Sequence, residues 1–280
     1  MDKAKTKIGV VFILTLMAIL ISVFAFAKPN QQAAGVVPSN GKATVTIPSN
    51  AIEVAPGVFS LGTAIDVDGR IVEGFMFVYR KENAKPPWAG GGNGKGGSTC
   101  YTFLAKGAKW KSLESWIVNP VNNQDLDSNF VFSNLAADIQ KWEDKSLTNI
   151  VGDGSATNNS LIADTASTDG VNEVYFGSIA DPGVIAVTII WGIFYGPPSG
   201  RELVEWDQVY DQVDFAWSAT GEAGKMDFEN IATHELGHAV GMGHPDNTCT
   251  EETMYAYSDY GETKKRDLNT GDTGGINSLY

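Results

Sequence analysis

The sequence has few histidines, few cysteines and few basic residues. Its 280 residues include 3 His and 2 Cys, and 20 Lys and Arg stand against 33 Asp and Glu, for a formal net charge of −13. Such an acidic chain lacks the basic surface that nucleic-acid binding requires, so we exclude that function. Two cysteines are too few for a disulfide framework, although one pair would suit an oxidising compartment. The hydrophobic content of 43% supports a buried core in one large domain or two small ones.

Residues 1–27 have the pattern of an export segment. Three lysines within the first seven residues are followed by an almost wholly apolar run over residues 8–26, and Ala25-Phe26-Ala27 fits a cleavage site of small residues. The alternative is a retained membrane anchor, because the run approaches the roughly 20 residues that span a bilayer. In either case we expect the rest of the chain to be extracellular or at the cell surface.

Residues 28–97 are expected to contain a spacer, a small β unit and a linker. Residues 28–44 are polar with Gly and Pro, as in a flexible spacer. From Val45 to Arg80 the pattern has a period of two, with Asp68-Gly69 as a hairpin turn. The glycine-rich stretch at 85–98 is the clearest boundary. Because the β unit is too small to fold alone, we expect it to pack on the domain at 98–280.

The part of the chain from Ser98 onward alternates strand and helix patterns. We predict strands at 110–118, 172–177, 184–191 and 203–210, a helix from Asp127 or Ser128 to about Asp144, and a second helix from the cap Asp227 to Val240. The stretch at 184–191, VIAVTIIW, is nearly continuously apolar, which fits a strand that is buried on both faces.

The stretch HELGHAVGMGH carries the chemistry. His234 and His238 lie four residues apart, so a helix places both imidazoles on one face, where they can share a metal ion. Gly241 lets the chain leave the helix, and His244 returns as a third nitrogen ligand. Glu235 can reach a water on the metal without being a ligand. Three protein ligands with one open position indicate a catalytic zinc site.

The alternative is a helix that carries chance histidines on its solvated side. All three histidines of the chain fall in this pattern, which favours the zinc site. Zinc held by neutral imidazoles brings the pKa of a bound water near neutrality, so Glu235 can act first as general base and then as general acid in peptide hydrolysis.

This motif resembles the signature of the metzincin zinc endopeptidases, HExxHxxGxxH followed by a methionine turn. Met254 in ThrMetTyr takes the place of the methionine, and Met254-Tyr255 is similar to the version in matrixins. The closing segment Gly271–Tyr280 resembles the matrixin C-terminal helix, and Lys106–Val118 resembles the matrixin entry strand. The resemblance covers about residues 98–280.

The resemblance implies an α+β fold. A metzincin-like catalytic domain would contain a twisted, mostly parallel sheet with an antiparallel edge strand, an N-terminal helix, the zinc helix and a C-terminal helix, here preceded by a small β extension. By position, residues 184–191 resemble the edge strand along which metzincins lay an extended substrate. Met254 would form a hydrophobic base beneath one catalytic zinc and would not be a ligand.

Other metals are suggested only by the same resemblance. The loop at 152–169 is rich in Asp, Asn, Ser and Thr and could hold calcium, as corresponding regions do in many matrixins, or it could be an ordinary solvated loop. Matrixins also carry a structural zinc with histidine ligands. No histidine is left for that site here, so we expect it to be absent.

The sequence departs from the matrixin pattern around the site. Pro245-Asp246 follows His244 where matrixins usually have serine, and Ala256 stands where they usually have proline. Tyr257 lies one residue beyond the position of the extra tyrosine ligand of astacins. "Matrixin-like" is therefore the accurate description, and substrate preference stays open. The PRCGxPD motif of matrixin latency is also missing, so we favour a stabilising β extension over a pro-segment that blocks the zinc.

The two cysteines are predicted to form a disulfide. Cys100 lies at the start of the expected domain, and Cys249 lies between His244 and Met254. An exported chain favours pairing them, and closing a ring of this size stabilises the fold by roughly 4 to 5 kcal/mol in the chain-entropy model. The alternative is that the thiolate of Cys100 caps the zinc in a latent form.

We therefore expect a secreted or surface-anchored zinc-dependent endopeptidase, a monomer that acts on proteins or peptides, with membrane contact only through an uncleaved N-terminal segment. A variant of this hypothesis is a processing enzyme with one surface partner. The alternative from another class is an inactive zinc-binding domain for surface assembly or adhesion. Glu235 argues against it, because a non-catalytic site needs no base beside its water.

Overall fold

The computed structural model describes residues 37–39, 42–82 and 100–280. They belong to one compact unit that spans residues 33–280. The expected export segment at 1–27 and the linker at 85–98 lie outside the described residues. Within those residues, no helix combines the length and the apolar character needed to cross a membrane.

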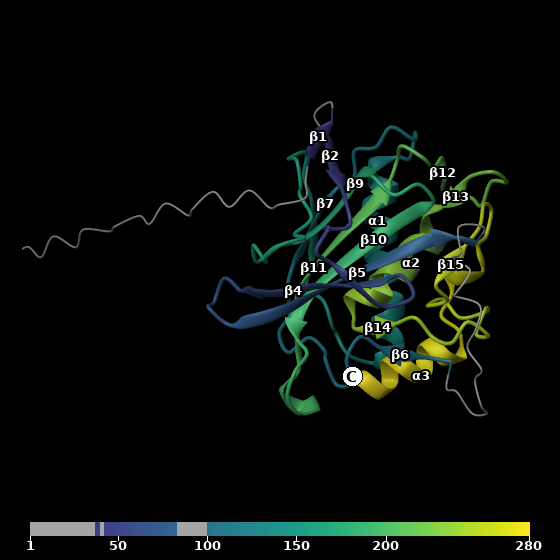
Figure 1. Cartoon of the computed structure of the whole chain (residues 1–280). Coiled ribbons are helices and arrows are strands. Elements are labelled where there is room, and N and C mark those ends of the chain that lie inside the picture. Colours follow the sequence, from purple (N-terminus) through teal and green to yellow (C-terminus); the bar gives the residue numbers. More distant parts are fainter. Residues whose placement is uncertain (1–36, 40–41, 83–99) are drawn as a thin grey trace, which may run out of the picture. The chain divides into compact units, whose positions relative to one another are not determined.

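The elements alternate along the chain much as the sequence patterns indicate (Figure 1). In chain order they are β1 (Val37–Ser39), β2 (Lys42–Val45), β3 (Ile52–Ala55), β4 (Val58–Ile65), β5 (Ile71–Lys81), β6 (Thr102–Phe103), β7 (Trp116–Asn119), α1 (Ser128–Ser146), β8 (Gly154–Ala156), β9 (Asn172–Ile179), β10 (Val184–Ile193), a 3-10 turn (Pro198–Gly200), β11 (Glu202–Asp211), β12 (Trp217–Ser218), β13 (Met226–Asp227), α2 (Phe228–Ala239), β14 (Met242–Gly243), β15 (Tyr257–Ser258), a second 3-10 turn (Lys264–Arg266) and α3 (Thr270–Leu279).

The central sheet has the expected mixed architecture. Strands β8, β7, β9 and β11 pair in parallel, and β10 pairs antiparallel to β11. With the three helices, this arrangement confirms the expected α+β fold class with a mostly parallel sheet.

The helices cover one face of the sheet. Asp127 caps α1 as predicted, because its carboxylate accepts hydrogen bonds from the backbone N–H groups of Asn129 and Phe130. Trp142 of α1 is fully buried, and its indole N–H donates to the Thr233 carbonyl of α2 at 3.0 Å. This bond joins α1 to α2, the helix that carries His234 and His238.

Strand β10 is not an edge strand, which corrects the expectation that it lines an open substrate groove. Residues Glu73 to Arg80 of β5 pair antiparallel with the side of β10 that does not face β11. Every β10 residue from Val184 to Gly192 is buried. Alternate side chains of β10 enter two apolar clusters on opposite faces of the sheet, which explains why the sequence of this strand is almost continuously apolar.

The β unit at 45–80 belongs to this same sheet instead of packing on it as a separate layer. Strand β4 pairs with β5, and β3 pairs with β4. The expected spacer also ends earlier than Thr44, because β1 and β2 form a hairpin and β2 pairs with β9 at Val45. Both segments join the sheet through main-chain hydrogen bonds along its edges. Side-chain patterns do not reveal such bonds.

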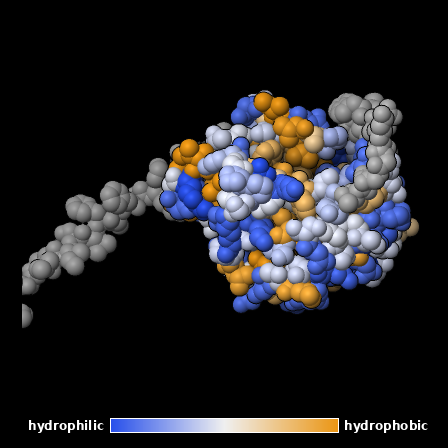
Figure 2. Space-filling model, turned by 90° about the horizontal axis from the view of Figure 1, so that it is seen from below, coloured by the Kyte–Doolittle hydropathy of each residue, from blue (hydrophilic) through white to orange (hydrophobic). Residues whose placement is uncertain are grey.

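The strand predicted at 110–118 is shorter than expected and covers only β7. The preceding residues turn towards α2, because the indole N–H of Trp110 donates to the Ala239 carbonyl at 2.8 Å. On the face of the molecule shown in Figure 2, hydrophobic residues lie in separate patches among hydrophilic ones.

Candidate active site

Helix α2 begins and ends where its sequence dictates. The Asp227 carboxylate caps the first turn by accepting a hydrogen bond from the Asn230 N–H at 3.0 Å. Gly241 follows the helix with φ +99°, a backbone conformation that strongly favours glycine. The chain then turns into β14, which pairs with β6, and the Thr102 hydroxyl donates to the His244 carbonyl at 2.8 Å. These contacts return His244 towards the helix.

The structure brings the three histidines of the motif together. The Nε2 atom of His244 lies 3.1 Å from that of His238 and 3.3 Å from that of His234. The Nδ1 atom of His234 lies 2.7 Å from the Thr253 carbonyl oxygen, and that of His238 lies 2.9 Å from the Met242 carbonyl oxygen. Carbonyl oxygens only accept, so both Nδ1 atoms carry the proton and both Nε2 atoms present lone pairs.

This arrangement fits a bound cation. When Nδ1–H of a neutral imidazole donates a hydrogen bond, its Nε2 carries no hydrogen, so Nε2 of His234 and Nε2 of His238 can each offer a lone pair to a cation placed between the three rings. Burial lowers the pKa values of His234 and His238 well below the ordinary value and that of His244 to about 4. Neutral imidazoles are the form that binds zinc.

Glu235 lies on α2 next to His234 and is fully buried. Its Oε2 accepts a hydrogen bond from the Thr188 hydroxyl of β10, while Oε1 has no hydrogen-bond partner among the described residues. Burial raises the pKa of the Glu235 carboxyl to about 8, and the bond from Thr188 opposes that shift. One oxygen is thus anchored and the other is left for a water or a substrate atom.

Met254 packs against the zinc-motif helix at Gly237. A Cβ on Gly237 would stand 2.2 Å from the Met254 sulfur, so the two residues are in close contact. Asp272 of α3 holds the turn, because its carboxylate accepts the backbone N–H groups of Thr253 and Met254 at 2.7 and 3.1 Å. The same turn presents the Thr253 carbonyl to His234. Sequence reasoning identified Met254 but missed Thr253 and Asp272, which no motif marks.

Cys100 and Cys249 are joined, with sulfurs 2.08 Å apart and Cα atoms 5.6 Å apart. The bond links the segment before β6 to the loop between His244 and Met254. In this arrangement neither sulfur is available as a thiolate for the zinc site.

Two aromatic side chains of β5 cover the histidines, which the sequence did not suggest. The Phe77 ring stacks on His238 with centroids 3.9 Å apart, and the Tyr79 ring stacks on His234 at 3.8 Å. Both rings are almost fully buried. Burial, reinforced by the Glu262 and Glu235 carboxylates, raises the pKa of the Tyr79 hydroxyl well above the ordinary value.

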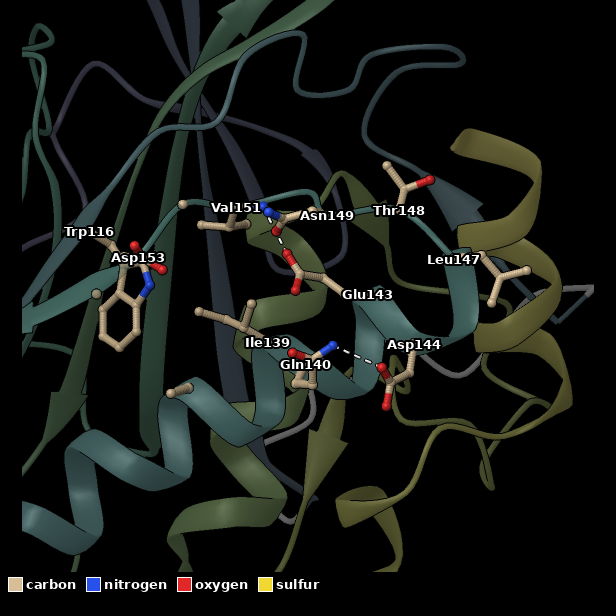
Figure 3. A pocket seen from close by; sticks show the side chains of 13 residues that line it. Trp116, Ile139, Gln140, Glu143, Asp144, Leu147, Thr148, Asn149, Val151 and Asp153 are labelled. Atoms are coloured by element: carbon tan, nitrogen blue, oxygen red, sulfur yellow. Dashed lines mark hydrogen bonds between the residues drawn. The ribbon is translucent and has the colours of Figure 1, made fainter.

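Two cavities differ in their relation to the histidines. One of about 450 Å³ reaches His244 and is lined by Pro56, Val58, Phe77, Phe103 and Ala256 among others. Another of about 620 Å³ lies at the C-terminal end of α1, where Gln140 donates to Asp144 (Figure 3). None of the three histidines lines the second cavity, so only the first is connected to the proposed metal centre.

A second group of side chains that could hold a metal ion lies on the other face of the sheet. Ligand oxygens of Asp164, Glu205 and Asp207 lie within 4.8 Å of one another. Burial raises the pKa of Asp164 to about 7 and that of Glu205 to about 9, and nearby carboxylates contribute. Asp164 belongs to the loop at 152–169 that was predicted to be oxygen-rich, whereas the two residues of β11 were not anticipated.

Comparisons with known proteins agree with the geometry. Residues 196–280 match the family model described as Matrixin. The chain is 35% identical over 89 residues to metalloendoproteinase 2-MMP of Arabidopsis thaliana, covering 31% of this chain and 22% of that protein. It is 39% identical over 56 residues to metalloendoproteinase 1-MMP of the same plant, covering 20% and 14%. The chain thus spans less than a quarter of the length of these relatives.

Proposed function

We propose that this matrixin-like metzincin is an exported zinc-dependent endopeptidase, with His234, His238 and His244 as the zinc ligands and Glu235 as the general base. One observation carries the proposal: three imidazole Nε2 atoms converge beside a buried carboxylate, one oxygen of which has no hydrogen-bond partner among the described residues. The catalytic part would comprise residues 98–280, and the protein would act as a monomer on proteins or peptides outside the cytoplasm. The apolar segment at 1–27 would direct export.

The residues around the site divide the chemistry among them. A zinc ion held by the three imidazoles supplies the Lewis acidity that makes water a nucleophile near neutral pH. The Thr188 hydroxyl holds Glu235 in position, so that its Oε1 can take the proton of the attacking water and pass it to the leaving amine. Thr253 and Met242 orient the imidazoles through their carbonyls, and Met254 supports α2 from below.

One observation favours the alternative, an inactive zinc-binding domain for surface assembly or adhesion. Phe77 and Tyr79 cover the imidazoles and leave no room for a substrate there. Glu235 favours the peptidase, because a purely structural zinc site has no use for a buried carboxylate with a free oxygen.

The test compares the native protein with Glu235→Gln, both loaded with zinc, in hydrolysis of unfolded casein. We expect the same zinc content and a rate at least a hundredfold lower, because the amide cannot accept the proton of water. Glu229→Gln on the same helix is the matched control and should retain its rate. A Glu235→Gln variant that cleaves casein at the native rate would rule out this mechanism.

We also propose that the Asp164, Glu205 and Asp207 group binds calcium. Two buried carboxylates and a third that is partly buried lie close together and need protons or a cation, and oxygen ligands are those that calcium prefers. Glu205 is 1% exposed, and its Oε1 has no hydrogen-bond partner among the described residues. Its Oε2 accepts the backbone N–H groups of Asp169 and Gly170, which fixes the carboxylate in place.

Thermal unfolding at several calcium concentrations tests this second metal site. A ligand that binds only the folded state raises the melting temperature, so native protein should melt higher in millimolar calcium. Glu205→Gln should show no calcium response, whereas Glu202→Gln on the same strand should respond like the native protein. A native melting temperature independent of calcium would end the proposal.

A further inference from the structure

Strand β5 lies between two strands that flank the candidate active site. It pairs antiparallel with β10 and parallel with β15, where Tyr257 and Ser258 are the partners of Arg80 and Lys81 (Figure 1). An extended peptide can join a sheet by main-chain hydrogen bonds to such flanking strands, and its alternate side chains then enter pockets. Strand β5 has the pairing that an added peptide would have.

The side chains of β5 that face α2 meet the histidines directly. Phe77 and Tyr79 are alternate residues and so lie on the same face of the strand. Besides stacking on His238, the Phe77 ring meets His244 edge-on at 5.7 Å, with the planes inclined by 88°. The Tyr79 ring is nearly parallel to the His234 ring, with an interplanar angle of 3°. These contacts place β5 directly over the three imidazoles.

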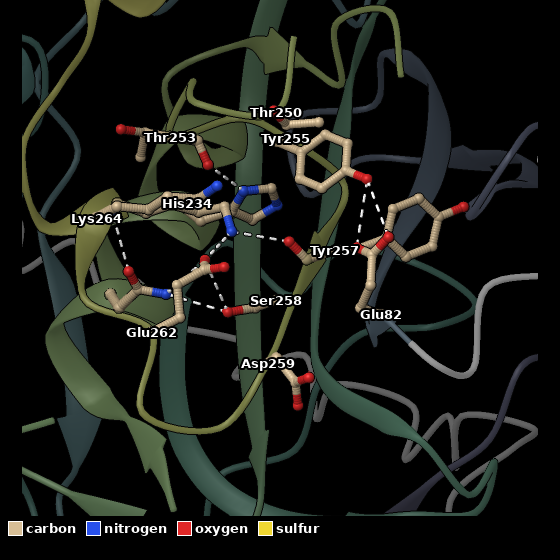
Figure 4. A network of polar contacts seen from close by, with 12 residues as sticks. Glu82, His234, Thr250, Thr253, Tyr255, Tyr257, Ser258, Asp259, Glu262 and Lys264 are labelled. Atoms are coloured by element: carbon tan, nitrogen blue, oxygen red, sulfur yellow. Dashed lines mark hydrogen bonds and ion pairs between the residues drawn. The ribbon is translucent and has the colours of Figure 1, made fainter. Parts of the chain in front are cut away.

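The Tyr79 side chain is buried in a space, here called the Tyr79 pocket, that polar side chains such as Lys265 border. Lys265 Nζ lies 5.8 Å from the centre of its ring and donates to the Tyr257 carbonyl at 2.8 Å. Ser258 donates to Glu262, which also pairs with Lys265 (Figure 4). These polar residues therefore satisfy one another. The Tyr79 hydroxyl has no hydrogen-bond partner of normal geometry among the described residues. The pocket therefore contacts the aromatic ring and does not recognise the hydroxyl by a hydrogen bond.

We propose that the groove between β10 and β15 is the substrate-binding groove, that β5 occupies it as an internal competitor, and that the Tyr79 pocket selects an aromatic side chain of the substrate. This inference rests on the proposed peptidase function for the identity of the substrate. It assigns to residues 52–82 the role of a removable occupant, in place of the purely stabilising extension that the sequence favoured.

The connections of β5 allow it to leave with its own hairpin. Among the described residues, β3 pairs with β4 and β4 with β5, so the strands β3–β5 join the rest of the sheet only through β10 and β15. An opening that releases the three strands together would break those pairings and also ion pairs such as Arg70–Glu202 and Arg80–Asp181, and it would leave the parallel part of the sheet paired. Local openings of this kind cost less than global unfolding.

A reversible disulfide staple tests this inference in the full-length protein. Met76 of β5 and Ile189 of β10 are direct partners on the face of the sheet opposite the histidines. The double substitution Met76→Cys with Ile189→Cys should lock β5 into the groove when oxidised. The matched control is Thr63→Cys with Glu73→Cys, partners that join β5 only to β4. Phe75→Cys with Ile190→Cys provides a second lock if the first protein does not fold.

Two measurements are made on each protein, oxidised and reduced. Cobalt is exchanged into the site, and binding of acetohydroxamate is followed by the visible spectrum of the metal. Casein hydrolysis is measured separately with zinc. We expect the oxidised β5–β10 staple to lower both acetohydroxamate binding and casein hydrolysis at least tenfold relative to its reduced form, whereas the control staple changes neither. Native protein given the same reductant corrects for effects on Cys100 and Cys249.

The outcomes separate this inference from the proposed function. If the oxidised β5–β10 staple binds acetohydroxamate and cleaves casein as well as the control staple does, β5 does not occupy the groove. If no form cleaves casein but acetohydroxamate binding still depends on the β5–β10 staple, the groove assignment stands and the peptidase proposal fails.

Discussion

The Tyr79 ring lies flat on the imidazole of His234, with the ring centroids 3.8 Å apart. Tyr79 comes from the extension that precedes the expected catalytic part, and His234 is the first proposed zinc ligand. The contact therefore couples the N-terminal strands to the proposed metal centre. Single substitutions at this contact can test whether β5 occupies the substrate groove as we propose.

Replacing Tyr79 by alanine should weaken the hold of β5 and raise activity. Loss of a buried aromatic side chain costs about 3 to 5 kcal/mol, and here the loss falls mainly on the docked state of β5. We expect casein hydrolysis to rise several-fold while the melting temperature falls. Tyr79→Phe should behave much like the native protein, because the hydroxyl makes no hydrogen bond of normal geometry among the described residues. Ile71→Ala, at a position of the same strand that is 52% exposed, is the control. An unchanged rate in a folded Tyr79→Ala protein would contradict the account.

Substrate preference should follow the pocket that Tyr79 fills. In a mixture of peptides, we expect cleavage products with phenylalanine or tyrosine at one fixed position next to the cleaved bond, favoured at least tenfold over alanine. A buried ring contributes enough apolar contact for such discrimination. Mass spectrometry of the products measures this, and products without any aromatic preference would show that the pocket does not select substrate.

Gly237→Ala should disturb the floor of the metal site. The added Cβ would meet the Met254 sulfur at 2.2 Å and the Trp142 ring at 2.7 Å, and overpacking of this kind costs about 1 to 3 kcal/mol. We expect a lower melting temperature and weaker zinc retention against a chelator. Gly200→Ala, where the new Cβ meets no atom closer than 4.0 Å, should change neither quantity. Native zinc retention in Gly237→Ala would show that Met254 does not support the site.

The disulfide makes a separate prediction. Thiol titration of the unfolded, unreduced protein should find no free thiol, since Cys100 and Cys249 are joined. Replacing both by serine should lower the free energy of unfolding by about 2 to 5 kcal/mol. Two titratable thiols in the native protein would contradict the bond.

Asp138 should make stability fall as the pH rises. It is fully buried on α1, and burial raises its pKa from 3.8 to about 7, although Lys141 donates to it and opposes that shift. Glu229 and Thr233 of α2 also face it. Between pH 4 and 7 the folded state therefore keeps a proton that the unfolded chain releases. This reduces the free energy of unfolding by up to about 1.4 kcal/mol per pH unit.

The Asp138→Asn variant should lack that slope. Its free energy of unfolding, measured in urea from pH 4 to 8, should fall less than that of native protein. Asp144→Asn, an exposed position on the same helix, serves as the control and should keep the native pH dependence. Parallel curves for native and Asp138→Asn would show that Asp138 is already ionised at pH 5.

The zinc motif could be recognised in the sequence because local backbone geometry explains the spacing of its residues. The spacing of His234 and His238 follows from the helix, and Gly241 follows from the turn after it. The fold class followed from the order of strand and helix patterns. The contacts that hold the site could not be predicted this way, since Thr188, Thr253 and Asp272 act across long sequence separations and belong to no motif.

The place of β5 was the main feature that the sequence concealed. Its alternating pattern indicated a strand but not its partners, because register depends on which sheet edge offers free main-chain groups. The continuous apolar run of β10 did indicate that this strand is buried on both faces. A strand that is buried on both faces is rarely an open edge. The family resemblance suggested instead that β10 is an edge strand.

Peptide hydrolysis by this protein should depend directly on the metal bound by the three histidines. The decisive measurement is casein hydrolysis while zinc is removed stepwise with a chelator and then restored, with zinc content determined at each step. We predict that the rate falls in proportion to the zinc lost and returns when one zinc per chain is regained. A rate that persists after the zinc is gone, or that zinc does not restore in a protein that remains folded, would contradict this dependence.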